Sequence, residues 1–189
     1  MKRMDAISEI AEKATDIDAL VVGNIGIPCK ELHQTCDIPN NFYMLGSMGL
    51  ASSIGLGLAL SLPERKIIAI DGDGSVLMNM GSLATIAWQA PENYLLIIID
   101  NGAYGSTGNQ PTATSQGTDL TRVAEGAGNL RVYDTDTKEG LRKILQETDN
   151  GIVVVRTLPG NAEVPNIKMS PEEIIKRFMA EASRPSSSV

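Results

Sequence analysis

Short apolar runs of strand length alternate along this chain with stretches of helical periodicity. Residues 66–70 and 94–99 are dominated by apolar side chains, whereas residues 2–14 and 138–147 place apolar side chains three or four positions apart. Strands that alternate with helices in this way form a parallel sheet with helices on both faces. We therefore predict an α/β fold with three layers, α/β/α, around a parallel sheet of about six strands.

The composition limits the classes of protein to consider. The 189 residues, 42% of them apolar, can bury one substantial core, so we expect one domain over residues 1–183 and a disordered tail over 184–189. A net charge of -7 argues against a nucleic-acid partner. The apolar stretches are shorter than the roughly 20 residues that cross a bilayer, and no signal-peptide pattern is present. We expect a cytoplasmic protein without membrane contact and a small ligand.

Three glycine-rich segments, residues 23–26, 46–49 and 72–74, each follow a predicted strand. In a parallel sheet such loops share the carboxyl edge of the strands, where ligands bind. A polar loop at residues 102–117 is longer than an ordinary connection, which is typical of functional loops. Elsewhere we expect a single helix from residue 75 to about residue 90 and a strand at residues 130–133.

The segment Gly72-Asp73-Gly74-Ser75 indicates a specific chemistry. Glycines let backbone N–H groups approach an anion at a helix N-terminus, and a carboxylate among them suits a divalent cation that bridges to a diphosphate. Mg²⁺ needs further oxygen ligands, and Asn101 ends the next strand 28 positions after Asp73. Asp73 alone could be a turn or helix-capping residue, but its pairing with Asn101 favours a metal site.

These residues resemble the binding motif of enzymes that depend on thiamine diphosphate (ThDP), such as pyruvate decarboxylase and acetolactate synthase. The resemblance covers Gly72-Asp73-Gly74 and Asp100-Asn101, and residues 72–86 are similar to the acetolactate synthase type. It implies that Asp73, the Asn101 side chain and the Ala103 carbonyl bind Mg²⁺, and that Ser75 reaches the diphosphate. Asp100 departs from the family, which more often has Asn at this position.

Residues 45–49 resemble the family segment that holds the pyrimidine ring of the cofactor. In the family, the Gly46 position accepts a hydrogen bond from the exocyclic amine, and a bulky residue at the Met48 position wedges the cofactor into a bent form. A core methionine after a turn is the alternative for Met48. The resemblance implies a cofactor-binding set of Asn24, Gly26, Gly46, Ser47, Met48, Gly72, Asp73, Gly74, Ser75, Asn101, Ala103 and Tyr104.

Other cofactors are less consistent with the sequence. Gly55 and Gly57 suggest a nicotinamide site, but they lack the third glycine of that motif and lie within a predicted helix. Cys29 and Cys36 are the only cysteines, too few to bind an iron–sulfur cluster within the chain, which disfavours the ferredoxin-dependent branch of the family.

A chain of this length has room for only the diphosphate-binding domain of these enzymes. In the family, the glutamate that activates ThDP belongs to a separate pyrimidine-binding domain. The resemblance therefore implies an α subunit that carries this domain and the activating glutamate, in a hetero-oligomer with at least two copies of each chain.

Residues 41–52 and 101–110 resemble the sulfopyruvate and phosphonopyruvate decarboxylase group. That resemblance implies decarboxylation of 3-sulfopyruvate, a small anionic 2-oxo acid, to sulfoacetaldehyde and CO₂ in coenzyme M biosynthesis, with ThDP as the electron sink. We expect loop 104–110 to close over the substrate, with Ser106 and Gln110 as donors to the sulfonate. Phosphonopyruvate or another 2-oxo acid stays open as the substrate, and an inactive ThDP-binding regulatory subunit is the alternative of another class.

His33 is the only histidine, and its ordinary pKa would suit proton transfer near neutral pH. A solvent-facing position on a helix is the alternative that the sequence favours. We therefore leave His33 outside the predicted site.

Overall fold

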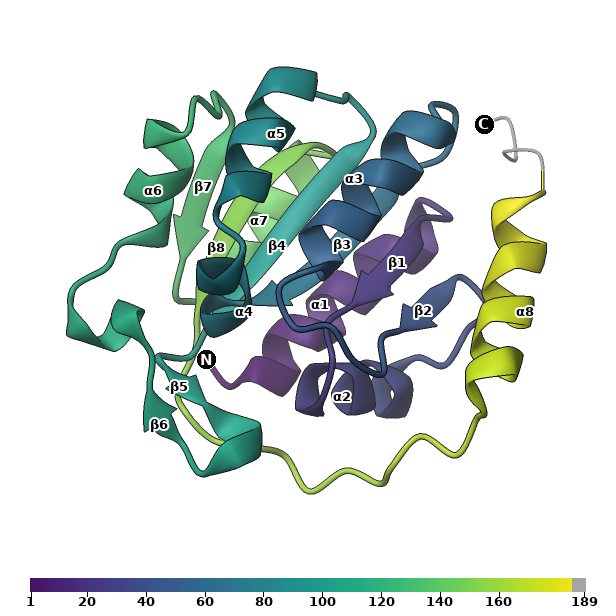
Figure 1. Cartoon of the computed structure of the whole chain (residues 1–189), viewed down its shortest axis with the longest axis horizontal. Coiled ribbons are helices and arrows are strands. Elements are labelled where there is room, and N and C mark those ends of the chain that lie inside the picture. Colours follow the sequence, from purple (N-terminus) through teal and green to yellow (C-terminus); the bar gives the residue numbers. More distant parts are fainter. Residues whose placement is uncertain (185–189) are drawn as a thin grey trace.

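A six-stranded parallel sheet forms the centre of the computed structural model, which describes residues 1–184 (Figure 1). Its strand order is β2-β1-β3-β4-β8-β7. The strands are β1 (Leu20–Gly23), β2 (Asn41–Tyr43), β3 (Ile67–Gly72), β4 (Tyr94–Asp100), β7 (Val132–Thr135) and β8 (Gly151–Arg156). This confirms the predicted fold class. Apart from Arg184, the predicted tail lies outside the described residues.

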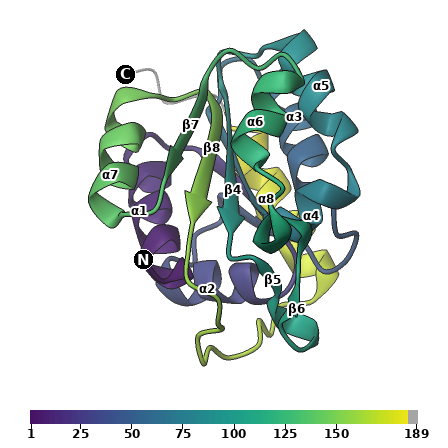
Figure 2. The same ribbon diagram turned by 90° about the vertical axis from the view of Figure 1, so that its left-hand side faces the viewer.

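Helices cover both faces of the sheet, because alternate side chains of each buried strand point to opposite faces (Figure 2). Val21, Ile68 and Ile97 pack on one face against α1 (Arg3–Asp16), α2 (Ile27–Thr35) and α7 (Lys138–Glu147). The other face, with Val22 and Ile98, is covered by α3 (Ala51–Ser61), α4 (Asp73–Met78), α5 (Gly81–Gln89) and α6 (Leu120–Gly126). Within residues 1–184, no helix is both long and apolar enough to span a bilayer.

The last helix, α8 (Pro171–Ala182), lies along the β2 edge of the sheet (Figure 1). Phe178 of this helix contacts Phe42 of β2, with the ring centroids 5.3 Å apart. Residues 157–170, which we call the connecting segment, run from β8 past the carboxyl ends of the strands to α8. The connecting segment therefore passes beside the edge where ligands bind in such sheets.

The order of the strands creates a switch point between β1 and β3. From β1 the chain passes outward to β2, then returns to form β3 on the opposite side of β1. Connections that leave two neighbouring strands in opposite directions open a crevice at their carboxyl ends. The three glycine-rich segments, which follow β1, β2 and β3, meet the loop after β4 at this edge, as the sequence predicts.

Two elements differ from the sequence-based expectation. The single helix expected from residue 75 to about residue 90 is wrong, because α4 ends at Met78 and α5 begins at Gly81. Asn79 interrupts the helix, and its side chain donates to Gly49 O at 3.0 Å and to Ser53 Oγ at 3.2 Å. A tertiary contact with another loop thus outweighs local helix propensity.

The strand expected at residues 130–133 is displaced by two residues, to β7 (Val132–Thr135). Its register is set by β8, with Val132 opposite Ile152, and Leu130 stays 99% exposed. The polar loop also contains a short hairpin of β5 (Ala103–Tyr104) and β6 (Gln110–Pro111), with 3₁₀ turns at Gly105–Thr107 and Ala113–Gln116. These elements are set by contacts that a local pattern does not reveal.

Candidate functional site

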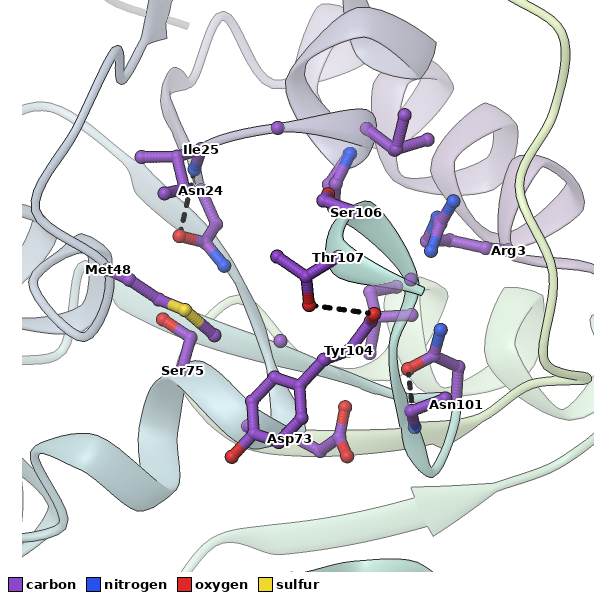
Figure 3. A pocket seen from close by; sticks show the side chains of 18 residues that line it. Arg3, Asn24, Ile25, Met48, Asp73, Ser75, Asn101, Tyr104, Ser106 and Thr107 are labelled. Atoms are coloured by element: carbon purple, nitrogen blue, oxygen red, sulfur yellow. Dashed lines mark hydrogen bonds between the residues drawn. The ribbon is translucent and has the colours of Figure 1, made fainter. Parts of the chain in front are cut away.

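A pocket of about 200 Å³ opens at the switch point, at the carboxyl ends of β1, β3 and β4 (Figure 3). Eleven residues from the predicted set line it: Asn24, Gly26, Met48, Gly72, Asp73, Gly74, Ser75, Asn101, Ala103, Tyr104 and Ser106. The pocket thus brings together residues that lie up to 82 positions apart in the sequence. The predicted residues Gly46, Ser47 and Gln110 are described but stand outside its lining.

The loop after β1 presents the N-terminus of α2 to the pocket. Gly26, at a φ of 83°, precedes the helix, and Pro28 occupies its first turn. No acidic side chain lies in that turn and no side chain caps it. Uncapped backbone N–H groups and the positive end of the helix dipole therefore face the cavity, which suits an anion.

Two glycines are required by close approaches within the pocket. A Cβ atom on Gly74 would lie 2.3 Å from the Tyr104 ring, and one on Gly26 would lie 2.9 Å from Ser106 Oγ. Any side chain at Gly74 would displace Tyr104 from the lining. The hairpin that carries Tyr104 and Ser106 is thus packed directly on the two loops that offer backbone N–H groups.

Asp73 begins α4 and is buried beside the polar loop. Its Oδ2 accepts hydrogen bonds from the hydroxyl groups of Thr112 and, at 3.0 Å, Thr114. Thr114 also lies 2.8 Å from Asp100 Oδ1. Burial, together with the nearby charge of Asp73, raises the pKa of Asp100, although the Thr114 hydroxyl opposes the shift. Two carboxylates and two hydroxyl groups therefore form one polar cluster, which adjoins the pocket through Asp73.

A second buried carboxylate, Asp71, lies two residues before Asp73. Its Oδ1 accepts from the N–H of Gly72 at 2.9 Å. Burial raises the pKa of Asp71 to about 6, against the opposing effect of its hydrogen bonds. The strand end before the glycine loop thus concentrates negative charge, which favours a nearby cation.

The oxygen atoms of Asp73, Asn101 and Ala103 fit the requirements of Mg²⁺. They supply one carboxylate, one amide and one backbone carbonyl at the same pocket, all hard oxygen donors. The Asn101 Oδ1 accepts from the N–H of Ala103 at 3.3 Å, which links two of the three proposed ligand residues (Figure 3). Within residues 1–184, no group of three or more His, Cys, Asp or Glu side chains is placed to hold a metal. The metal roles of these three residues stay predictions.

The side chains of Ser75, Gln110 and His33 make contacts within the chain. Ser75 Oγ accepts from the N–H of Gly49 at 2.8 Å, which ties the loop that carries Met48 to α4. Gln110 is exposed, and its side-chain amide donates to Thr107 O at 2.9 Å, so it supports the hairpin. His33 lies on α2, 3.6 Å from Asp37, and does not line the pocket.

Two pocket residues, Arg3 and Thr107, and the two threonines that hold Asp73, Thr112 and Thr114, were not predicted from the sequence. The threonines lie in the polar loop, whose composition indicated function but not which side chains turn inward. Arg3 begins α1, 70 positions before Asp73, and no local pattern connects it with the site.

Comparisons with known proteins agree with this geometry. Residues 22–156 match the family model described as the thiamine pyrophosphate enzyme, C-terminal TPP binding domain. The chain is 49% identical to the sulfopyruvate decarboxylase subunit beta of Methanocaldococcus jannaschii, over 97% of this chain and 98% of that protein. It is 38% identical to the phosphonopyruvate decarboxylase of Streptomyces viridochromogenes, over 89% of this chain and 43% of that protein.

A solved structure from Mycobacterium smegmatis, described as a thiamin diphosphate-dependent enzyme, has a similar fold. The two superpose with a TM-score of 0.62 at 21% identity, over 82% of this chain and 31% of that one. At this level of identity, the similarity establishes the shared fold alone.

Proposed function

Because this chain belongs to the thiamine pyrophosphate enzyme family and to its sulfopyruvate decarboxylase β subunits, we propose that it decarboxylates 3-sulfopyruvate to sulfoacetaldehyde and CO₂. The single observation that carries the proposal is the 49% identity to such a β subunit, which extends over 97% of this chain. The lower identity to a phosphonopyruvate decarboxylase makes phosphonopyruvate the second candidate substrate. We also propose the cytoplasm as the location and coenzyme M biosynthesis as the pathway.

The cofactor would lie with its diphosphate between the N-terminus of α2 and the glycine loop before α4. Asp73, Asn101 and the Ala103 carbonyl would hold Mg²⁺ against it, and Met48 would contact its rings. When bound, ThDP supplies the electron sink for loss of CO₂. The described part of this chain brings no glutamate to the pocket, so the activating glutamate would come from a partner.

The proposed partner is an α subunit with a pyrimidine-binding domain, and α3–α5 offer it a surface. No residue from Ile38 to Pro63 or from Gly74 to Pro91 is charged. Large apolar side chains nevertheless face solvent there, and we call them the uncharged face: Leu45, Leu50, Leu60, Met78, Met80 and Trp88. An exposed apolar surface of this kind is typical of a protein interface.

The position of the uncharged face supports this occupant. Gly49 packs against Met78, because a Cβ atom on Gly49 would lie 3.3 Å from Met78 Cβ. The neighbouring Met48 lines the pocket, so the uncharged face continues into the site. A partner bound there would lie next to the exposed end of the cofactor. In the phosphonopyruvate decarboxylase of Streptomyces viridochromogenes, the segment that matches this chain makes up 43% of the protein, which leaves room for a fused partner domain.

The decisive experiment measures CO₂ release from 3-sulfopyruvate, phosphonopyruvate and pyruvate. The chain is assayed with ThDP and Mg²⁺, alone and after co-expression with the candidate α subunit. Preference for sulfopyruvate only in the complex supports the proposal. Turnover by this chain alone contradicts the shared site, and preference for phosphonopyruvate establishes the second candidate.

The metal assignment is tested with Asp73→Asn. This change removes the only carboxylate from the three proposed ligands, so we expect Mg²⁺-dependent binding of ThDP to weaken by about 100-fold or more, as measured by calorimetry. Glu64→Gln is the matched control, because Glu64 is an exposed carboxylate at the opposite end of β3. Equal binding by Asp73→Asn and the control would contradict a metal at Asp73.

A further inference from the structure

Arg3 is a buried cation at the pocket, and the proposed function leaves it without a role. Its side chain is 94% buried, with a relative exposure of 6%. Arg3 and Asp73 are the only charged residues among those that line the pocket. Figure 3 shows Arg3 on the side of the pocket away from Met48. An arginine this deeply buried needs specific partners for its charge.

Two of the three guanidinium nitrogens of Arg3 are already hydrogen-bonded. Nε donates to Glu31 Oε2 at 2.7 Å, and Nη2 donates to Glu31 Oε1 at 2.9 Å and to Asn161 Oδ1 at 3.1 Å. Within residues 1–184, Nη1 has no hydrogen-bond partner. The carboxylate therefore holds the guanidinium from one side and leaves two N–H donors unused.

The surroundings fix Arg3 in this position. The Asn161 side chain, in the connecting segment, also donates to Gly105 O at 2.7 Å, and the N–H of Ala162 donates to Glu31 Oε1 at 3.3 Å. Arg3 is thus linked to α2, to the connecting segment and to the hairpin that carries Ser106. A guanidinium held this firmly loses little further entropy when it binds a ligand.

The pocket also contains the uncapped N-terminus of α2, with Ile27 and Pro28 in the lining, and Arg3 is bonded to Glu31 of the same helix. A helix N-terminus and an unused arginine donor pair are independent features, and both favour an anion. We propose that Arg3 is an anion-binding residue that takes a tetrahedral oxyanion in the pocket. Under the proposed function, that anion is either the terminal phosphate of ThDP or the sulfonate of the substrate. Only these two identities of the anion rest on the proposed function.

The test uses three variants, because Arg3→Gln alone would leave Glu31 buried and unpaired. The double variant Arg3→Gln with Glu31→Gln removes both charges, Arg3→Lys keeps the positive charge, and Glu31→Gln keeps the guanidinium but breaks the pair. Thermal unfolding establishes that each is folded. Calorimetry then measures binding of inorganic diphosphate and of ThDP with Mg²⁺ to the full chain, and KM for 3-sulfopyruvate is measured in the complex with the α subunit at saturating ThDP.

We expect the double variant to bind one of the two anions about tenfold or more weakly than the wild type. Arg3→Lys should recover part of this binding, and Glu31→Gln should bind the anion as tightly as the wild type or more tightly. Weaker binding of diphosphate and ThDP identifies the phosphate. An increase in KM for sulfopyruvate but not for pyruvate identifies the sulfonate.

If the Arg3–Glu31 pair had a purely structural role, the double variant and Glu31→Gln would weaken anion binding to the same extent, because both break the same pair. Equal weakening in the double variant and in Glu31→Gln would therefore overturn the proposal, as would unchanged binding and KM in a folded double variant. Diphosphate binding does not depend on the substrate. A failure to decarboxylate sulfopyruvate would therefore count against the proposed function, while diphosphate binding would still decide the role of Arg3.

Discussion

The two helical faces of the sheet differ in charge. On the face of α1, α2 and α7, ion pairs join neighbouring elements: Glu9 binds Arg142 and Lys138, and Lys13 binds Asp149. On the opposite face, α3, α5 and the part of α4 that follows Asp73 contain no charged residue, and Trp88 is 82% exposed. Both faces bury a similar apolar layer against the sheet, so the difference lies in what their outer sides contact. The charged side suits water, whereas the uncharged face suits another protein.

The largest expected effect comes from a charge placed on the uncharged face. Met78 is 63% exposed, so Met78→Glu should leave the chain folded but weaken association with the α subunit by about 100-fold or more, because a carboxylate would be buried at the interface. Sedimentation of the mixed subunits measures this association. Met179→Glu is the control, because Met179 is 49% exposed on α8, outside the uncharged face. Equal effects of the two changes would remove the distinction between the faces.

A smaller effect, on the free energy of unfolding, distinguishes the inner side of α3 from its outer side. A Cβ atom on Gly55 would lie 2.8 Å from the Tyr94 ring and 2.9 Å from Ala69 Cβ, so Gly55→Ala should lower the free energy of unfolding by about 1–3 kcal/mol. Gly57 has no such neighbour within 4 Å, and Gly57→Ala should raise stability by about 0.5–1 kcal/mol through helix propensity. Urea unfolding of the chain alone measures both. A loss of stability in Gly57→Ala would show that the outer side is already packed.

The smallest effect concerns pH and the charged side. A hydrogen bond from Arg142 is the largest influence that lowers the pKa of Glu9, with Lys138 adding to it against the effect of burial. A carboxyl group with a lowered pKa in the folded state stabilises the protein above its ordinary pKa, and this contribution is lost as pH falls through the folded-state value. Glu9→Gln should therefore lower the melting temperature by about 2 °C at pH 7 and have less effect near pH 3.

Thermal unfolding across this pH range tests the prediction. Thr85→Val on α5 is the control, because α5 has no titratable side chain. The effect of Thr85→Val on the melting temperature should therefore not change with pH. A pH-independent difference between wild type and Glu9→Gln would contradict the role of the ion pair.

The sequence determined the fold class and the chemical character of the site. Apolar runs of strand length are a local feature, so β3 and β4 and their loops were predicted without knowledge of their neighbours. Gly74 and Asp73 were predicted as site residues because a backbone that approached an anion and a metal would require these residue types directly after a strand, and both line the pocket. The register of β7 and the break at Asn79 were not predicted, since contacts with β8 and Gly49 decide them.

Only the tertiary structure decided which distant residues share the pocket and which apolar side chains stay outside the core. Arg3 reaches the pocket because α1 folds against the edge of the sheet, and its sequence neighbours carry no sign of this. Thr112 and Thr114 lie in a loop whose composition indicated function, but only the fold turns their hydroxyl groups toward Asp73. The apolar residues of α3 and α5 read alike in the sequence, yet Leu56 and Leu83 are buried while Leu60 and Trp88 are exposed. Periodicity shows that a helix has faces, but packing against the sheet determines which face is covered, because burial depends on neighbours brought together by the whole chain.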